Sequence, residues 1–177
     1  MSDEIVLVPF DPNWPHHYAL ARDELLGLLR EPPILIEHIG STAVPGLVAK
    51  PVIDIIVLVA AMPPVQEQLP ALEAIGYEFR PAVSTDQRLF MRRHGPGGTR
   101  THHLHVHTDR EDVKRHIVFR DVLRRDASVR RAYIELKLHL AAIHGDDRQA
   151  YARGKDGFID DVVQKAGGPP RAPFWNA

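Results

Sequence analysis

The residues best suited to chemistry begin with the tripeptide Gly40, Ser41 and Thr42. They follow an apolar run and precede residues 44–49, which are expected to form a short helical turn. Backbone N–H groups at such a turn, exposed by the glycine and reinforced by the helix dipole, can bind a phosphate. Taken alone, the tripeptide is more typical of a tight turn with a Ser or Thr helix cap. Other residues must therefore decide between the two roles.

Asp54 interrupts an otherwise apolar run, residues 52–59, whose pattern predicts a strand buried on both faces. A carboxylate in such a strand is costly unless it is paired, hydrogen-bonded or bound to a metal. Asp54 is therefore a candidate metal ligand. The alternative is a buried aspartate satisfied by backbone donors or by a basic neighbour. Lys50 can be that neighbour, or it can reach a phosphate.

Histidines are concentrated in residues 94–107, which hold five of the 11 in the chain. His103 and His105 are two residues apart in a segment that predicts a strand, so their side chains share one face and can share a metal. The alternative is a polar sheet face whose imidazoles bond to their neighbours, since no third ligand follows at a diagnostic spacing. The face should hold Thr101, His103, His105 and His107, with His102, Leu104 and Val106 on the other.

Basic and aromatic side chains near these segments can complete a site for an anion. Arg92 lies on the preceding strand and Arg120 on the following helix, although several basic residues here are expected to be solvated surface. Tyr151 and Lys155 are four residues apart on the last predicted helix and so share a face. They can close over an anion, or they can pack beside Phe158.

The periodicity of apolar residues predicts an α+β fold, with a mixed, mostly antiparallel sheet, flanking helices and a helical C-terminal third. Strands are expected at residues 5–8, 34–36, 52–59, 77–80, 88–94 and 101–107, the last two forming a hairpin. Helices are expected at residues 14–30, 65–75, 111–125, 129–144 and 147–165. Pro70 should kink or shift the second helix, and Ser128 should cap the fourth.

Length and composition are those of one domain, expected at residues 1–166, with a flexible tail at 167–177. The absence of cysteine excludes disulfides, thiolate zinc sites and thiol catalysis, and favours a cytoplasmic protein. Residues 2–4 and the run that follows them do not resemble a signal peptide, and no apolar run is long enough to cross a membrane. The 23 acidic and 22 basic residues exclude a broad nucleic-acid surface, so any anion must be bound locally.

The sequence closely resembles the GrpB family (UPF0157) of nucleotidyltransferase-like proteins. The resemblance is carried by two segments, Glu37-His38-Ile39-Gly40-Ser41-Thr42-Ala43-Val44-Pro45-Gly46-Leu47 and Lys50-Pro51-Val52-Ile53-Asp54-Ile55. It continues through Pro9-Phe10-Asp11-Pro12-Asn13-Trp14-Pro15, Thr101-His102-His103-Leu104-His105-Val106, Phe119-Arg120-Asp121-Val122-Leu123-Arg124, and Tyr151 with Lys155 and Phe158-Ile159. It implies the nucleotidyltransferase fold, in which a Gly-Ser turn positions a nucleoside triphosphate and acidic residues on adjacent strands hold magnesium.

Gly40 and Ser41 match the turn of that superfamily, and Asp54 matches its first acidic position. The sequence departs from the pattern two residues later, where Ile56 replaces the second carboxylate. The third acid can correspond to His103 or His105. The resemblance implies magnesium as the metal. One aspartate with imidazoles is a poor set of ligands for magnesium, however, and the histidines also allow zinc or manganese.

The resemblance implies that the protein moves a nucleoside monophosphate from a triphosphate to an unknown acceptor. Asp54 and His105 would be the catalytic residues, and Gly40, Ser41, Thr42, Lys50, Arg92, Arg120, Tyr151 and Lys155 would bind the nucleotide or another phosphate. Asp54, His103 and His105 would bind the metal. The alternative is a nucleotide-binding or anion-binding module of low or no activity, regulatory or assisting folding with a protein partner, because similar domains are fused to dephospho-CoA kinases. A third hypothesis is hydrolysis at a histidine-rich metal site.

Overall fold

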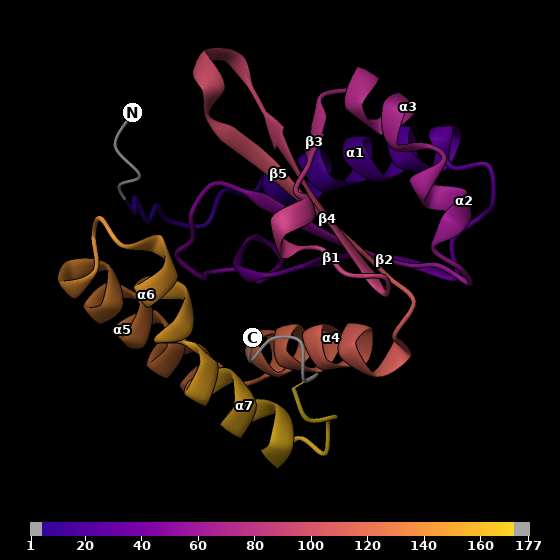
Figure 1. The fold of residues 1–177 in the computed structure, drawn as a ribbon. Helices are drawn as coiled ribbons and strands as arrows, with labels where there is room; N and C mark the ends of the chain where they lie inside the picture. The colour runs from indigo at the N-terminus through magenta and orange to yellow at the C-terminus, as the bar shows by residue number, and fades with distance from the viewer. Residues whose placement is uncertain (1–4, 172–177) are drawn as a thin grey trace.

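A computed structural model describes residues 5–171 of the chain and shows a five-stranded sheet in the order β1-β2-β5-β4-β3 (Figure 1). The strands are β1 (Leu35–Ile39), β2 (Ile53–Leu58), β3 (Tyr77–Phe79), β4 (Arg88–His94) and β5 (Arg100–His107). Among these strands of residues 5–171, only β2 and β5 pair in parallel, and the other three pairs are antiparallel. The mixed, mostly antiparallel sheet and the hairpin of β4 and β5 confirm the fold predicted from the sequence.

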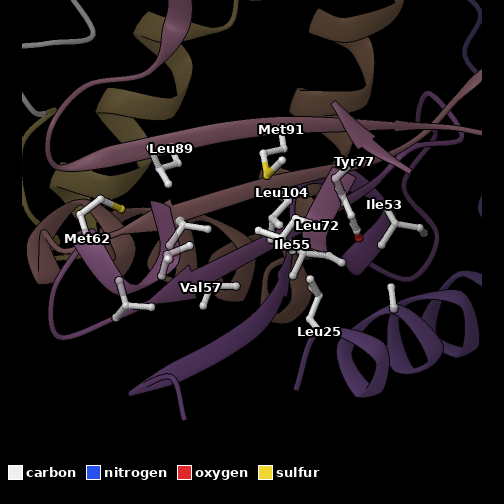
Figure 2. Close-up of a cluster of buried hydrophobic side chains, with 14 of the residues drawn as sticks. Leu25, Ile53, Ile55, Val57, Met62, Leu72, Tyr77, Leu89, Met91 and Leu104 are labelled. Carbon is white, nitrogen blue, oxygen red and sulfur yellow. The ribbon is translucent and has the colours of Figure 1, made fainter. Parts of the chain in front are cut away.

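Three helices cover one face of the sheet, namely α1 (Trp14–Leu28), α2 (Pro63–Gln66) and α3 (Leu69–Ala74). Leu25 of α1 and Leu72 of α3 pack against Ile55 and Leu104 in the main core (Figure 2). Pro70 lies in the first turn of α3, where its missing N–H costs nothing, so the helix expected at residues 65–75 is divided in two.

The helical C-terminal third lies on the opposite side of the sheet (Figure 1). It contains α4 (Arg110–Arg125), α5 (Ala127–Ile143), α6 (Arg148–Arg153) and α7 (Asp156–Lys165). Val113 of α4 packs on Ile39, Ile56 and Leu58, so β2 is covered on both faces as its apolar pattern predicts. No helix of residues 5–171 is long and apolar enough to span a bilayer.

The structure corrects the N-terminal expectations at two places. The strand expected at residues 5–8 is reduced to one antiparallel bridge between Val8 and Ala49. In this register Pro51 lies opposite Val6 and has no N–H with which to continue the ladder. The helical turn expected at residues 44–49 is a 3₁₀ turn at Ser41–Ala43 instead, directly after Gly40.

The C-terminal expectations also need correction. Asp126, not Ser128, caps α5, since its carboxylate accepts from the backbone N–H groups of Ser128 and Val129. The helix expected at residues 147–165 is divided at Gly154, where a Cβ atom would overlap Leu140. Of the flexible tail expected at 167–177, the structure describes residues 167–171.

Those described tail residues contact the helices. Pro169 is buried, and its carbonyl accepts a hydrogen bond from Arg115. Arg171 forms an ion pair with Asp156 at 2.7 Å. The remaining tail residues, 172–177, and residues 1–4 at the N-terminus lie outside the described part of the chain.

Candidate functional site

A cleft of about 620 Å³ opens between the sheet and the helices α5 and α6. It is lined by nine of the eleven residues predicted for the site, namely Ser41, Thr42, Lys50, Asp54, Arg92, His103, His105, Tyr151 and Lys155. The strands supply the acidic and imidazole groups, and the helices supply cations from the other wall. Residues separated by up to about a hundred positions in the sequence therefore share one site.

Asp54, His103 and His105 form a compact group at the floor of the cleft. The parallel register aligns Asp54 with His103, so His103 Nδ1 lies 2.9 Å from Asp54 Oδ1. His105 Nε2 lies 3.9 Å from the same oxygen. One ligand atom from each of the three residues lies within 4.8 Å of the others. The sequence predicted this set, but only the pairing of β2 with β5 brings it together.

The protonation of this group suits a metal ion. Burial alone would raise the pKa of Asp54, but the hydrogen bonds and charges of the two histidines hold it well below its usual range. Burial lowers the pKa of His105 to about 4, although Asp54 opposes the shift. Asp54 is thus ionised and His105 neutral near pH 7, which are the forms that bind metals. One carboxylate with two imidazoles fits zinc, nickel or manganese better than magnesium.

Gly40 is needed where it stands because it packs directly against Asp54. Its φ angle is +70°, and a Cβ atom there would overlap Oδ2 of Asp54 and lie 3.0 Å from its Cγ. The Thr42 hydroxyl donates to the carbonyl of Val52 and lies 3.0 Å from Nε2 of His38, which fixes the turn to the sheet. The turn that was predicted to bind phosphate therefore also packs against the carboxylate of Asp54.

Lys137 on α5 is a site residue that the sequence reading missed. It is only 2% exposed, and its ammonium donates to Oγ of Ser41 at 2.9 Å and to the carbonyl of Val48. Burial, followed by the charge of Lys155, lowers the pKa of Lys137 to about 7. A signal was present, because Lys137 lies four residues after Tyr133 and three before Leu140, within the apolar stripe of its helix.

Lys50 and Lys155 complete a group of three lysines with Lys137. The Nζ atoms of Lys50 and Lys155 each lie 4.6 Å from the centre of the Tyr151 ring. Burial, followed by the charge of Lys155, lowers the pKa of Lys50 to about 8, and burial also lowers the pKa of Lys155. Within residues 5–171, no ion pair joins any of the three ammonium groups to a carboxylate.

Further arginines line the cleft. Alternation along β4 points Arg92 into it, with the guanidinium 5.4 Å from the centre of the Phe90 ring, whereas Arg93 faces the other side and pairs with Glu24. Burial lowers the pKa of Arg92. Arg88, Arg100 and Arg148 also line the cleft and were not among the predicted site residues.

Arg120 lies outside the cleft, which corrects its predicted contact with a phosphate. Its guanidinium bonds to Glu37 at 2.6 Å, to Asp121 at 2.8 Å and to the carbonyl of His38 at 2.9 Å, and the residue is only 6% exposed. Arg120 therefore joins α4 to β1 and has a structural role. Glu37 is occupied by this ion pair, so it does not supply a second carboxylate to the site.

Ile56 stands where the superfamily pattern has its second carboxylate. The side chain is fully buried between β2 and α4, in contact with Ile39 and Val113. Asp54 is consequently the only carboxylate among the described residues that line the cleft.

Comparisons with known proteins identify the family to which the chain is similar. The profile described as "GrpB protein" matches residues 4–165. UPF0157 protein PA4798 of Pseudomonas aeruginosa is 40% identical over 98% of this chain and 72% of its own length. A dephospho-CoA kinase of Mycobacterium tuberculosis is 27% identical over 96% of this chain, which spans 47% of that protein.

Solved structures extend the comparison to the fold. The crystal structure of the conserved protein GrpB from Enterococcus faecalis superposes with a TM-score of 0.82 at 34% identity, covering 91% of this chain and 96% of that one. A cytoplasmic RNA terminal U-transferase superposes with a TM-score of 0.55 at 15% identity, covering 76% of this chain and 43% of that one. The second likeness concerns the fold alone. The chain belongs to the GrpB family, and its fold resembles that of the nucleotidyltransferases.

Proposed function

We propose that the cleft binds the phosphates of a nucleoside triphosphate or of another phosphate ester. The observation that carries this proposal is the convergence of Lys50, Lys137 and Lys155 in one cleft with no acidic partner in the described chain. Altogether seven Lys or Arg side chains and one carboxylate line the cleft. This excess of positive charge in one cleft of a nearly neutral protein favours an anionic ligand.

The energetic argument rests on burial. An ammonium group removed from water is destabilised unless it gains a partner, and the lowered pKa values of Lys50 and Lys137 express this cost. A bound phosphate would supply strong, charge-assisted hydrogen bonds to the same groups. Ser41 lies beside Lys137 and adds a hydroxyl to this part of the site.

We also propose a divalent metal ion on Asp54, His103 and His105, chosen for the mixed ligand set. When bound, such an ion would neutralise phosphate charge and polarise a phosphoryl oxygen. The neighbouring lysines then have the separate role of binding the phosphates that the metal does not reach.

Nucleotidyl transfer is the reaction we propose for this site, with the acceptor unidentified. The likeness in fold to an RNA terminal U-transferase supports it. The transfer would break the bond between the α- and β-phosphates and form a bond from the acceptor oxygen to the α-phosphate, releasing pyrophosphate. The buried Ile56 favours a second candidate, a binding module with little turnover, since two-metal transfer needs a further carboxylate. The likeness to part of a dephospho-CoA kinase supports such a module in longer proteins.

Thermal unfolding with added ligand tests phosphate binding. A nucleoside triphosphate at a hundredfold excess over its dissociation constant should stabilise the fold by about 2.7 kcal/mol. Lys155→Met should weaken this effect, whereas Lys114→Met, an exposed residue on α4, should leave it unchanged. The proposal is refuted if no nucleoside triphosphate, nor phosphate, nor coenzyme A changes the thermal unfolding of the native protein.

Calorimetry tests the metal. The native protein should bind zinc, nickel or manganese more tightly than magnesium, and His105→Ala should abolish the preference. Equal, weak binding of all four ions by both proteins would contradict the assignment.

Release of pyrophosphate distinguishes enzyme from binding module. An enzyme should release it with one of these metals, and Asp54→Asn should stop the release while leaving some nucleotide binding. A native protein that binds triphosphate but releases no pyrophosphate with any metal or acceptor would support the binding module.

A further inference from the structure

The aromatic rings of the cleft are already covered by the protein's own side chains. Tyr151 is only 1% exposed and has both Lys50 and Lys155 at 4.6 Å from its ring centre. Phe90 is 7% exposed. Its ring has His103 and His105 at centroid distances of 5.3 and 4.9 Å, with Arg92 at 5.4 Å. Because proteins usually hold a base against an open ring face, neither Phe90 nor Tyr151 can stack on a nucleobase without displacing a cation or an imidazole.

The neutral polar groups of the cleft are also poorly suited to reading a base edge. Among the described lining residues there is no Asn or Gln, the side chains that pair with a base through a donor and an acceptor together. The hydroxyls of Ser41 and Thr42 are engaged by Lys137 and by the carbonyl of Val52. The carboxylate of Asp54 is engaged by His103.

The charge of the cleft, by contrast, suits more than one phosphate. Lys50, Lys137 and Lys155 bring three ammonium groups, and Arg92 on the opposite wall brings a fourth cation that forms no ion pair with a carboxylate of residues 5–171. One phosphate monoester carries a charge of roughly −2 at neutral pH and would leave about half of this charge unmatched. Ammonium groups are compact point charges without a preferred plane, so they suit the varied oxygens of a phosphate chain.

We propose that this cleft recognises a chain of two or more linked phosphates and is indifferent to the base attached to it. The inference rests on the proposed binding of phosphate and specifies the class of ligand. Any nucleoside triphosphate meets the requirement, and so does inorganic tripolyphosphate. A nucleoside monophosphate or a free nucleoside does not.

Calorimetric titration of the native protein tests the proposal with ATP, GTP, CTP, UTP, inorganic tripolyphosphate, AMP and adenosine, under one metal condition. The four triphosphates should bind with dissociation constants within about threefold of one another, and tripolyphosphate within about tenfold of them. AMP should bind at least about a hundredfold more weakly, and adenosine should not bind. Lys155→Met should weaken the binding of the four triphosphates and of tripolyphosphate by the same factor. Lys114→Met should leave the binding of all five unchanged.

Three results would overturn the proposal. If one triphosphate binds more than about tenfold more tightly than the other three, the base is recognised, although phosphate binding as such would stand. If AMP binds as tightly as ATP, a single phosphate is the ligand. If none of the triphosphates, tripolyphosphate and AMP binds, both this inference and the proposed function fail.

Discussion

Replacing Lys137 by methionine should stabilise the ligand-free protein near pH 7 while changing its stability little at pH 9. The pKa of Lys137 falls from its ordinary value of 10.5 to about 7 on folding, chiefly because the side chain is buried. Between these two values the unfolded chain holds the proton that the folded protein tends to lose. The unfolded state therefore binds more protons, and the free energy of unfolding rises with pH.

The magnitude follows from the same values. Each unit of pKa difference is worth about 1.4 kcal/mol, so this lysine costs the fold about 4 kcal/mol at pH 7 and about 2 kcal/mol at pH 9. Methionine fills a similar volume but loses the hydrogen bonds to Ser41 and Val48, worth about 1 kcal/mol each. The free energy of unfolding of Lys137→Met should therefore equal that of the native protein at pH 9 and exceed it by about 2 kcal/mol at pH 7.

Urea unfolding followed by circular dichroism, in buffers free of phosphate and sulfate, measures the free energy of unfolding of both proteins at pH 7 and at pH 9. The control is Lys114→Met, because the Lys114 side chain is 58% exposed and its removal should leave the native dependence on pH intact. If native and Lys137→Met proteins give parallel stability curves, or if the variant is equally destabilised at both pH values, Lys137 does not carry a buried, unneutralised charge and the reasoning fails.

Three other substitutions test separate parts of the site. Gly40→Ala should destabilise the protein by at least about 1 kcal/mol more than Gly46→Ala in urea unfolding, because both glycines have positive φ angles but only the first would clash with Asp54; equal losses would contradict that contact. Asp54→Asn should flatten the loss of stability in acid, since a carboxylate with a depressed pKa stabilises the fold above its unfolded value of 3.8 and loses this effect as the pH falls; acid titration of unfolding would show an unchanged profile if this is wrong. Arg120→Met should lower the free energy of unfolding by about 1–3 kcal/mol by removing the ion pair with Glu37, yet leave the calorimetric affinity for triphosphate unchanged. If the folded variant no longer binds triphosphate, Arg120 is a binding residue and the structural role is wrong.

Much of the fold could be predicted because its signals are local. Residues 52–59 were identified as a buried strand from their continuous apolar pattern, and β2 occupies residues 53–58. The alternation of residues 101–107 placed His103 and His105 on one face, since successive side chains of any strand point to opposite faces. Errors fell at boundaries, such as Val8 and Ser128, where one hydrogen bond decides whether an element continues.

The sequence by itself determined the strand that carries Asp54, the shared face of the two histidines and the glycine turn at Gly40, because chain geometry over a few residues decides each of them. Only the tertiary structure decided which charged groups share the cleft. Lys137 and Arg120 are both basic residues on buried helix faces, and nothing in their neighbouring sequence separates a ligand-binding role from a structural one. Arg120 meets the carboxylate of Glu37, whereas Lys137 meets the hydroxyl of Ser41 and no acid in the described chain. A buried charge is stabilised by the partner that the fold brings within a few ångströms, and that partner lies more than eighty residues away in both cases.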